Sequence, residues 1–382
     1  METKDIDSAS GALREEARER IARHVKPVVD AKKQGERLSN AEMRGLYKAF
    51  APMGYLGSTI PKEAGGAGLS YLQYGLLLEA LGSSPVMLGE IVPPRSIFFL
   101  GDEAQRERWL PRLLAGDMVA TAAITEPQAG SDLRSMTTSA VKADGGYRLN
   151  GRKKWIKLGG VADAMTVLAI TDPETKPKGM SRFFIERDAT PWTAEELPCI
   201  GIRNVSFAEI GFDDLQLDEG NLLAGGTDGV EGFYRGIEAS RALIGLQAAG
   251  LAAEAIRLAK EYAKERTAFG RPLAKFQAVQ TRIADAAAAV EASRALSISA
   301  LRILDDGRRC PREAAMAKVF ATEAAVAACM AAMSCMGAHG LSEAAGVERL
   351  LRDATMLTVI DGASDIQRLI VGREEFGVAA FV

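Results

Sequence analysis

The chain has 382 residues, 47% of them hydrophobic and 25% charged, with a formal net charge of −3 at pH 7. This length exceeds one average domain, so we expect two or three packed units. The small net charge gives no reason to expect nucleic acid or an anionic membrane as a partner. The N-terminus lacks the apolar core of a signal peptide, and the four cysteines lack CxxC spacing. We therefore expect a cytoplasmic protein without a disulfide framework or a metal site.

The N-terminal part has a helical pattern. Apolar residues recur every four positions from Leu13 to Val25, and Asn40 is suited to cap a second helix. The glycine-rich loop at 61–70 matches no phosphate-binding motif, so we expect a turn that leads into a helix. The helices expected here lie within 9–34, from Asn40 onward, at 71–81 and at 104–114.

The middle of the chain has a different residue pattern. Between Val119 and Leu223, short apolar or alternating runs are separated by Gly, Asp, Asn and Pro, which is typical of an antiparallel β-domain. Strands and helices do not alternate and no GxGxxG follows a strand, so a doubly wound dinucleotide-binding fold is disfavoured. The expected strands lie at 119–124, 137–142, 147–149, 164–170, 182–185 and 208–212.

From Gly236 onward the chain is again helical and rich in alanine, and its long segments predict an antiparallel bundle. The longest apolar run, 324–338, is too short to span a bilayer and is expected to be buried. The fold predicted is α+β and multi-domain: an N-terminal helical domain over 1–118, a middle β-domain over 119–232 and a C-terminal four-helix bundle over 233–382. The helices expected in the bundle lie at 238–266, 276–304, 312–336 and 347–357.

Four motifs, in this order and spacing, resemble those of the acyl-CoA dehydrogenase family of flavoproteins. Each motif alone is a weak signal, because a capped turn or a buried core tryptophan would explain it equally well. They are ITEPQAGSD at 124–132, NGRKKWI at 150–156, RTAFGRPLAKFQ at 266–277, and VERLLRD at 347–353 continuing to DGASDIQR at 361–368. The similarity covers nearly the whole chain and implies FAD as cofactor.

The resemblance implies which residues hold the flavin within one subunit. Ile124 and Thr125 match the positions that hydrogen-bond the pyrimidine end of the ring. Gly130 and Ser131 match positions that touch the flavin phosphates and the acyl-CoA, where a small residue permits close approach. Trp155 matches an aromatic residue that packs against the isoalloxazine.

The resemblance also implies that a neighbouring subunit completes the FAD site, and hence a homotetramer or homodimer. Arg266 would pair with the pyrophosphate, for which an arginine fork is suited; the alternative is an exposed helix end. The residues expected to reach the neighbour's FAD are Arg266, Phe269, Gln277, Ser334 and Ala338.

Asp361 occupies the position of the family's catalytic base, which is usually Glu. It follows an apolar run, and desolvation of a carboxylate raises its pKa; on this stretch alone, a plain turn residue is the alternative. Some family members place the base where this chain has Ser240, and Glu238 is expected to face away from that position. Arg241 is expected near the site, where it would steady the carboxylate.

The family reaction is α,β-desaturation of an acyl thioester. The backbone N–H of Asp361 and the flavin ribityl 2′-hydroxyl would hold the thioester carbonyl and stabilise the enolate. Asp361 would take the α-proton while a hydride passes to flavin N5, and an electron-transfer flavoprotein is the expected acceptor. The substrate-binding residues implied are Ser131, Arg241, Ile360, Asp361 and Gly362.

The sequence also departs from the family pattern. Asp is one methylene shorter than Glu, so its oxygens lie roughly 1.5 Å further back, a displacement large enough to affect rate. We hypothesise an α-branched or alicyclic acyl group, such as a cyclohexane-carboxyl thioester, that fills the space. Lys157 replaces a threonine that donates to flavin N5; it either places a cation beside the flavin or points to solvent.

Three further positions are unusual. Ala363 and Asp365 replace a Thr and a Gln that help to hold the adenosine part of FAD, so FAD is held more weakly or by other groups. Arg95 follows two prolines; a surface position is favoured over an inward one, where it would bind a substrate carboxylate.

Three alternatives to an acyl-CoA dehydrogenase remain open in the sequence. In the first, the acyl group is attached to a carrier protein instead of CoA. The second is an oxidase resembling nitroalkane oxidase, which also uses Asp as base. A non-catalytic homologue that acts as a binding or assembly subunit is the third.

Overall fold

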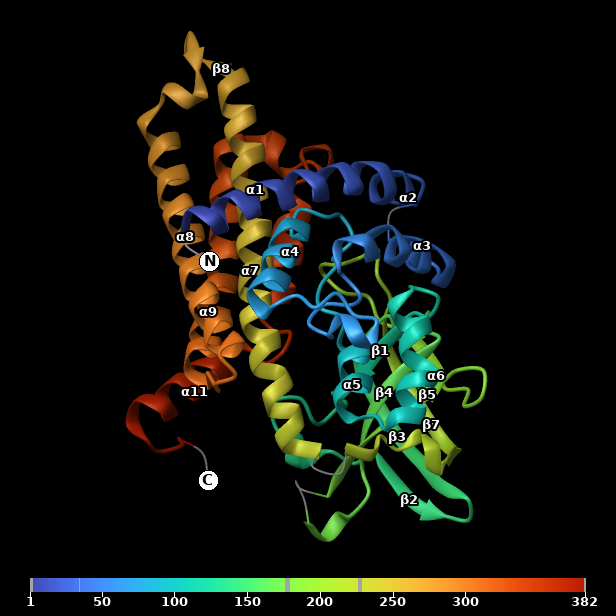
Figure 1. Ribbon diagram of the computed structural model, residues 1–382. Helices are drawn as coiled ribbons and strands as arrows, with labels where there is room; N and C mark the ends of the chain where they lie inside the picture. The colour runs from blue at the N-terminus through green and yellow to red at the C-terminus, as the bar shows by residue number, and fades with distance from the viewer. Residues whose placement is uncertain (1–2, 34, 176–178, 226–228, 381–382) are drawn as a thin grey trace.

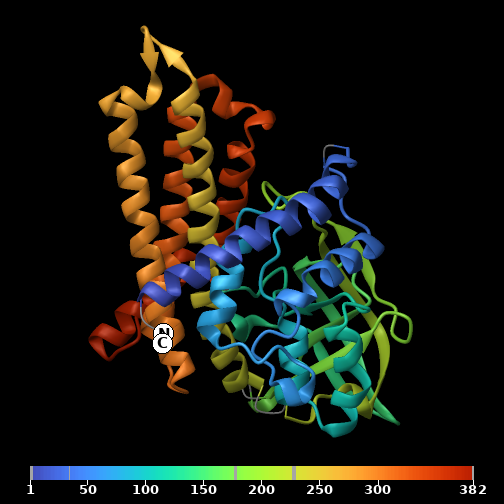
Figure 2. The same cartoon turned by 45° about the horizontal axis from the view of Figure 1, so that its top comes forward.

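A computed structural model describes residues 3–33, 35–175, 179–225 and 229–380. The elements fall into an N-terminal group of helices, a seven-stranded sheet and a C-terminal bundle of long helices (Figure 1). The sheet lies beside the lower half of the bundle, and α1 crosses the bundle from one side to the other in both views (Figures 1 and 2).

The N-terminal helices begin where polar side chains cap them. Ser39 accepts a hydrogen bond from the backbone N–H of Glu42, whose side chain accepts in return from Ser39 N–H. The cap of α3 is therefore Ser39, and the prediction of Asn40 was wrong by one residue. The bounds are α1 Thr3–Arg20, α2 Lys26–Asp30, α3 Asn40–Phe50, α4 Tyr71–Leu81, α5 Val92–Leu100 and α6 Glu103–Leu114.

The sheet is mixed. Its strands are ordered β1-β4-β2-β3-β7-β6, with β5 paired to the other edge of β4. β1 runs parallel to β4, and β2 meets β4 in the parallel sense, which the expectation of an antiparallel domain did not include. The pairs β2–β3, β3–β7, β4–β5 and β6–β7 are antiparallel, as expected. The bounds are β1 Ala120–Ala123, β2 Ser139–Ala143, β3 Gly146–Lys157, β4 Ala164–Ile170, β5 Met180–Glu186, β6 Thr193–Glu196 and β7 Phe207–Asp218.

A close helix contact joins the N-terminal helices to the C-terminal bundle. A Cβ at Gly250 of α7 would lie 1.9 Å from the backbone oxygen of Glu79, so glycine is what allows α4 and α7 to pack this closely. A short hairpin of β8 and β9 joins α7 to α8. The bounds are α7 Gly229–Glu265, β8 Thr267–Ala268, β9 Arg271–Pro272, α8 Gln277–Asp305, α9 Pro311–Met336, α10 Val347–Leu357 and α11 Ser364–Phe376.

Two segments, Gly236–Glu265 and Pro311–Leu341, are long and apolar enough to cross a membrane by length and composition alone. Their most apolar windows are 72% and 44% buried within the protein. Core helices of folded domains pass the same test, so these segments are weak support for a membrane span.

The middle of α10 is tied to the middle domain. The buried Asp353 accepts hydrogen bonds from the backbone N–H of Ile202 at 2.6 Å and from Arg349 at 2.9 Å. A Cβ at Gly201 would lie 2.3 Å from the backbone oxygen of Arg352, so the loop of the middle domain lies directly against α10. This contact fixes α10, and with it the turn that follows, relative to the sheet.

Candidate functional site

Asp361 lies in the turn between α10 and α11, with a φ of 54°. The carbonyl groups of this turn are held by side chains from the bundle. Lys318 on α9, which is fully buried, donates to the oxygens of Thr358 and Gly362, each at 2.8 Å. Gln367 on α11 donates to the oxygens of Gly362 at 2.9 Å and Asp361 at 3.2 Å.

Arg241 on α7 donates from Nε to the backbone oxygen of Asp361 at 3.4 Å, so the expected proximity is present. Sequence reasoning missed Lys318, although a lysine within the alanine-rich segment of α9 was a signal that could have been followed. Glu238 is buried against Arg309, to which it is hydrogen-bonded at 2.8 Å, and takes no part in holding the turn.

Burial raises the pKa of Asp361 to about 6. The carboxylate of Glu90 adds to this rise, whereas Arg241, Lys318 and Lys157 oppose it. The aspartate is thus ionised at neutral pH while remaining more basic than an exposed one.

Lys157 points inward, and the solvent-facing orientation is excluded. Its Nζ donates to the backbone oxygen of Met87 at 3.1 Å, and burial lowers its pKa to about 8 while Asp361 opposes that fall. Lys157 at the end of β3 therefore places a cation in the same site as Asp361.

A third charged group faces the site from the segment before α5. The side chain of Glu90 accepts a hydrogen bond from the hydroxyl of Ser240 and forms an ion pair with Arg95. Arg95 is buried on α5, with its guanidinium 5.6 Å from the centre of the Tyr71 ring. The expectation of a surface arginine was wrong because the two prolines form the first turn of α5 instead of an exposed loop.

The motif that begins at Ile124 forms a loop anchored by a buried ion pair. Glu126 and Lys153 are both fully buried and lie 2.8 Å apart, and Lys153 also donates to the oxygen of Ile124 at 2.9 Å. The other oxygen of Glu126 accepts from the backbone N–H of Thr137 at 2.7 Å. These contacts hold the pKa of Glu126 well below its usual value, at about 2.

The loop and the end of β3 present groups suited to a flavin ring. Trp155 has a φ of 62° at an irregularity in the β3–β7 pairing, and it is 52% exposed. The hydroxyls of Thr125 and Ser131 donate to no group in the part of the chain that the structure describes. An exposed aromatic face beside uncommitted hydroxyls fits the isoalloxazine and its polar edge. Gly130 is exposed in the same loop.

The residues expected to reach a neighbour's FAD are not brought to Asp361 in one chain. They are exposed and lie at the opposite end of the bundle, near the β8–β9 hairpin (Figure 1). At about 1.5 Å per helical residue, Ser334 lies roughly 24 Å along α9 from Lys318. The residues at this end are Arg266, Phe269, Gln277, Ser334 and Ala338.

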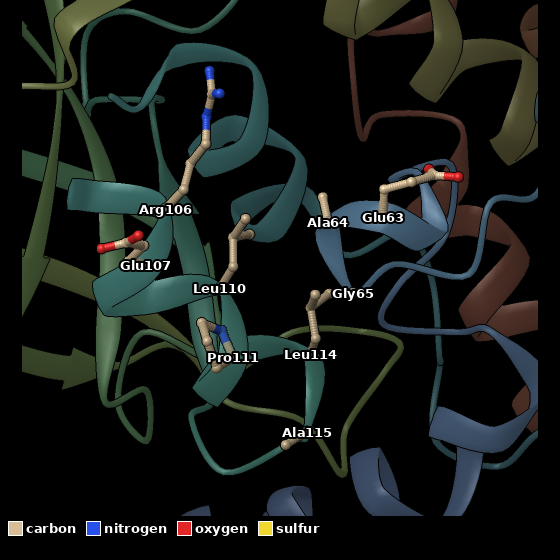
Figure 3. Close-up of a pocket in the computed structure, with 9 residues that line it drawn as sticks. All are labelled: Glu63, Ala64, Gly65, Arg106, Glu107, Leu110, Pro111, Leu114 and Ala115. Atoms are coloured by element: carbon tan, nitrogen blue, oxygen red, sulfur yellow. The ribbon is translucent and has the colours of Figure 1, made fainter. Parts of the chain in front are cut away.

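Ile360, Gly362 and Ala363 are partly buried around Asp361, whereas Asp365 is exposed and pairs with Arg368 at 3.3 Å. A separate hollow of about 530 Å³ lies between α6 and the loop before α4 (Figure 3). It is lined by residues such as Leu110 and Glu63, and none of its lining residues belongs to the site around Asp361.

Three family models match the chain in succession. They are the N-terminal domain of acyl-CoA dehydrogenase at residues 8–117, its middle domain at 121–215 and its C-terminal domain at 227–376. An acyl-CoA dehydrogenase of Bacillus subtilis is 35% identical over 339 residues, which cover 87% of this chain and 89% of that protein.

Two other relatives bear on substrate and cofactor. A cyclohex-1-ene-1-carbonyl-CoA dehydrogenase of Syntrophus aciditrophicus is 35% identical, over 85% of this chain and 80% of that protein. A glutaryl-CoA dehydrogenase of Mycobacterium smegmatis, solved in complex with FADH2, superposes with a TM-score of 0.87 at 25% identity. That alignment covers 100% of this chain and 97% of the other.

Proposed function

Since this chain belongs to the acyl-CoA dehydrogenase family of flavin-dependent oxidoreductases, we propose that it desaturates an acyl thioester with Asp361 as the base. The observation that carries the proposal is the turn around Asp361, where burial raises the pKa of the carboxyl to about 6. A base with a pKa close to the working pH combines ionisation with proton affinity. FAD is the cofactor of the family and, when bound, supplies the acceptor for the hydride.

The backbone of the turn is suited to the thioester. The N–H groups of Asp361 and Gly362 donate to no acceptor in the described part of the chain. The carbonyl oxygens of the same two residues, by contrast, accept hydrogen bonds from Gln367 and, at Gly362, from Lys318. We assign the N–H of Asp361 to the thioester oxygen, where a fixed donor stabilises the charge that develops as the α-proton leaves. Ser131, Arg241, Ile360 and Gly362 complete the proposed substrate contacts.

We propose an α-branched or alicyclic acyl group, such as cyclohexane-carboxyl. The argument is the short side chain of Asp361, which leaves room for a ring close to the backbone. The relative that acts on a cyclohexene-carbonyl thioester supports the same class of substrate. The proposed electron acceptor is an electron-transfer flavoprotein.

We propose the flavin contacts from the residues that match the family motifs. Arg266 and Phe269 of a second copy would complete the site, because in one chain they lie too far from Asp361 to share a cofactor with it, which implies a homotetramer or homodimer. The protein is proposed to be soluble and cytoplasmic, with domains at 1–118, 119–232 and 233–382. The proposed FAD contacts are Ile124, Thr125, Gly130, Ser131, Trp155, Lys157, Arg266, Phe269, Gln277, Ser334, Ala338, Ala363 and Asp365.

Anaerobic bleaching of the oxidised flavin tests the proposal. Purified holoenzyme would be mixed with linear, branched, alicyclic and dicarboxylic acyl-CoAs, and the same panel would be run with Asp361→Asn. We expect bleaching by ring or branched substrates, and a loss of at least a thousandfold in its rate in the variant. Asp306→Asn, which removes an exposed carboxylate after α8, is the matched control and should bleach normally.

Other outcomes point elsewhere. A linear butyryl or octanoyl thioester that clearly outperforms every ring substrate would remove the substrate class. Rapid oxygen consumption with nitroalkanes, but no bleaching by thioesters, would favour an oxidase. Protein that cannot take up FAD would favour a non-catalytic homologue.

A further inference from the structure

Lys318 is a buried cation whose partners are backbone carbonyl groups. Its side chain is fully buried on α9, and its ammonium group donates to the oxygens of Thr358 and Gly362, each at 2.8 Å. No carboxylate in the part of the chain that the structure describes forms an ion pair with it. Moving an ammonium ion out of water costs several kcal/mol unless other groups replace the water. An apolar residue would avoid this cost, so the charge at this position indicates a specific task.

The first carbonyl that Lys318 binds is at the end of α10. Thr358 is the C-cap of this helix, and the free oxygens at a helix C-terminus carry the negative end of its dipole. A lysine that binds such an oxygen caps the helix and is attracted by the dipole. The second carbonyl, that of Gly362, lies beyond Asp361 in the turn. One ammonium group therefore ties the chain together on both sides of the proposed base.

The backbone between these two points has an unusual conformation. Asp361 has a φ of 54°, which non-glycine residues rarely adopt, and Gly362 has a φ of 99°. Such a conformation persists where the surroundings impose it. Two carbonyl groups that converge on one ammonium group fix the peptide planes at both ends of the turn, and Gln367 and Arg241 bind the oxygen of Asp361 between them. Together these bonds limit the rotation of the N–H of Asp361.

The charge of Lys318 also acts on the Asp361 carboxyl. Burial and the carboxylate of Glu90 raise the pKa of Asp361, whereas Arg241, Lys318 and Lys157 oppose that rise. The three cations come from α7, α9 and β3, so each element contributes one. Without Lys318 the carboxyl would have a higher pKa and would be ionised to a smaller extent near neutral pH.

Lys318 keeps its charge at neutral pH. Burial lowers its pKa to about 8, and Asp361 and Glu323 oppose this fall, whereas Arg241 adds to it. A value of about 8 leaves most of the ammonium groups protonated at pH 7.

From these contacts we infer that Lys318 is a positioning residue of the desaturation: by tying Thr358 to Gly362, it holds the N–H of Asp361 toward the thioester oxygen and the Asp361 carboxyl toward the α-proton. It acts through the turn and not by contact with the substrate. The inference deepens the proposed function and rests on it, because it requires Asp361 as the base.

Lys318→Met tests the inference, because it keeps the length of the side chain and removes its charge and its donors. The variant should fold and bind FAD, since the oxygen of Thr358 keeps the N–H of Ser364 at 3.1 Å and that of Gly362 keeps Gln367 at 2.9 Å. Circular dichroism and the flavin-to-protein ratio check this.

Thr322→Val is the matched control. Thr322 is buried one turn further along α9, and its hydroxyl donates within the helix to the oxygen of Lys318 at 2.9 Å. The substitution removes a buried hydrogen bond from the same helix without removing a contact to the turn.

The first readout does not require turnover. The FAD-loaded Asp361→Asn protein cannot remove the α-proton, so it can hold cyclohexane-carbonyl-CoA or octanoyl-CoA, each labelled with ¹³C at the thioester carbonyl. A hydrogen bond to this carbonyl lowers its stretching frequency, which infrared difference spectra measure. We expect a lowered frequency in the Asp361→Asn protein. At least half of that shift should be lost when Lys318→Met is added, and all of it should be kept when Thr322→Val is added.

The second readout uses the protein with Asp361 intact. Lys318→Met should reduce kcat/KM about a hundredfold, since a displacement on the order of 1 Å at a catalytic group has this effect. The rising limb of its pH profile should move to higher pH, because one of the cations that oppose protonation of Asp361 is gone. A residue that only filled space in the core would leave this limb in place, and Thr322→Val should change neither quantity.

The failure of the inference can be told apart from that of the proposed function. Either an unchanged carbonyl frequency or an unchanged pH profile in Lys318→Met would overturn the inference and leave the desaturation intact. Binding of neither ester, or a full rate in Asp361→Asn, would overturn the proposed function as well. If Lys318→Met does not fold, Lys318→Gln, which is one atom shorter and uncharged, replaces it. The rising limb must then move in the same direction, and an unchanged limb would overturn the inference.

Discussion

At the scale of single residues, the chemistry depends on what surrounds one carboxyl group. Asp361 lies among Arg241, Lys318 and Lys157, yet burial and Glu90 together outweigh the three cations and leave its pKa at about 6. If burial were absent, these cations would push the value below that of a free aspartate. The raised pKa of Asp361 is thus the net result of large opposing effects.

The pH dependence of activity should show this value. Asp361 takes a proton only when ionised, so kcat/KM is expected to rise with pH and to level off above an apparent pKa of about 6. Steady-state rates with the best substrate between pH 5 and 8 measure it. A rise centred near 4 would mean that the carboxyl is as solvated as a free aspartate and that the assigned environment is wrong.

The free energy of unfolding should fall with rising pH, whereas activity should rise, and Asp361 is the cause of both. The folded pKa is higher than the unfolded one, so the folded state binds the proton more tightly, and the free energy of unfolding falls as pH rises from about 4 to about 6. Asp361→Asn removes this cost, and at pH 8 we expect a gain of up to about 3 kcal/mol. Urea unfolding of both proteins at pH 4 and pH 8 measures the difference, which should fall below about 1 kcal/mol at the lower pH.

At the scale of elements, the conformation of the loop after β1 depends on the buried carboxylate of Glu126. Glu126 connects this loop to β3 through Lys153 and to the start of β2 through Thr137. The loop carries the proposed flavin contacts at Thr125 and Ser131. Its conformation is therefore determined by a partner about thirty residues away along the chain.

Glu126→Gln should loosen this loop and weaken the protein. The substitution leaves the buried Lys153 without its counter-charge, which costs about 3–5 kcal/mol of unfolding free energy, and FAD affinity should fall with it. Urea unfolding and FAD titration measure the two effects.

Glu209→Gln is the control for that substitution. Glu209 pairs on the same sheet with Arg152 and Lys154, both of which reach solvent, so its loss should cost about 1 kcal/mol or less. Equal losses in the two variants would show that the buried pair has no special role.

The sequence predicted most elements but not how they meet. Apolar periodicity located α8, α9, α10 and most strands to within a few residues, because each signal is local, whereas α7 begins nine residues before the expected position 238. The parallel pairing of β1 with β4 depends on which strands become neighbours, and no alternation pattern records it. α5, β6 and α11 were missed: two prolines obscure the first, the second is short and largely exposed, and the third has an irregular apolar pattern.

The residues of the candidate site likewise fall into those that the sequence predicted and those that it did not. Asp361, Arg241 and the loop at 124–132 were found because the residues that carry the resemblance are contiguous in sequence. Lys318 was missed because it reaches the turn from α9, and only the folded chain brings it there. Gln367 lies within the motif at 361–368 and Glu90 within the unusual segment before α5, but neither was given a role, because the sequence alone does not show their contacts. Arg95 was placed on the surface because two prolines before it resemble a turn.

At the scale of the whole molecule, the two sets of proposed FAD contacts lie far apart: one on the middle domain and after α10, the other at the hairpin end of the bundle (Figure 1). The hairpin at one end carries Phe269, which is 95% exposed, an unusual degree for a large aromatic side chain. A second copy of the chain that covers this end would bury it and would bring Arg266 to the cofactor of its partner.

Phe269→Glu should therefore reduce both the oligomer mass and the FAD content, because a charge would enter the proposed interface. Light scattering after size exclusion and the flavin-to-protein ratio measure the two together. Val141→Glu on β2, at a position 60% exposed and away from the hairpin, should change neither. A Phe269→Glu protein with unchanged mass and full flavin would argue against a site shared between subunits.

The exposure of Trp155 gives the protein a built-in optical probe. Of the three tryptophans, Trp109 and Trp192 are buried in the core, and Trp155 alone meets solvent at the proposed flavin face. A small aqueous quencher should therefore reach only this indole in the cofactor-free protein, and bound flavin should shield it. The fraction of emission that remains accessible would report occupancy of the site during purification, reconstitution or a drug screen, without a label and without any turnover.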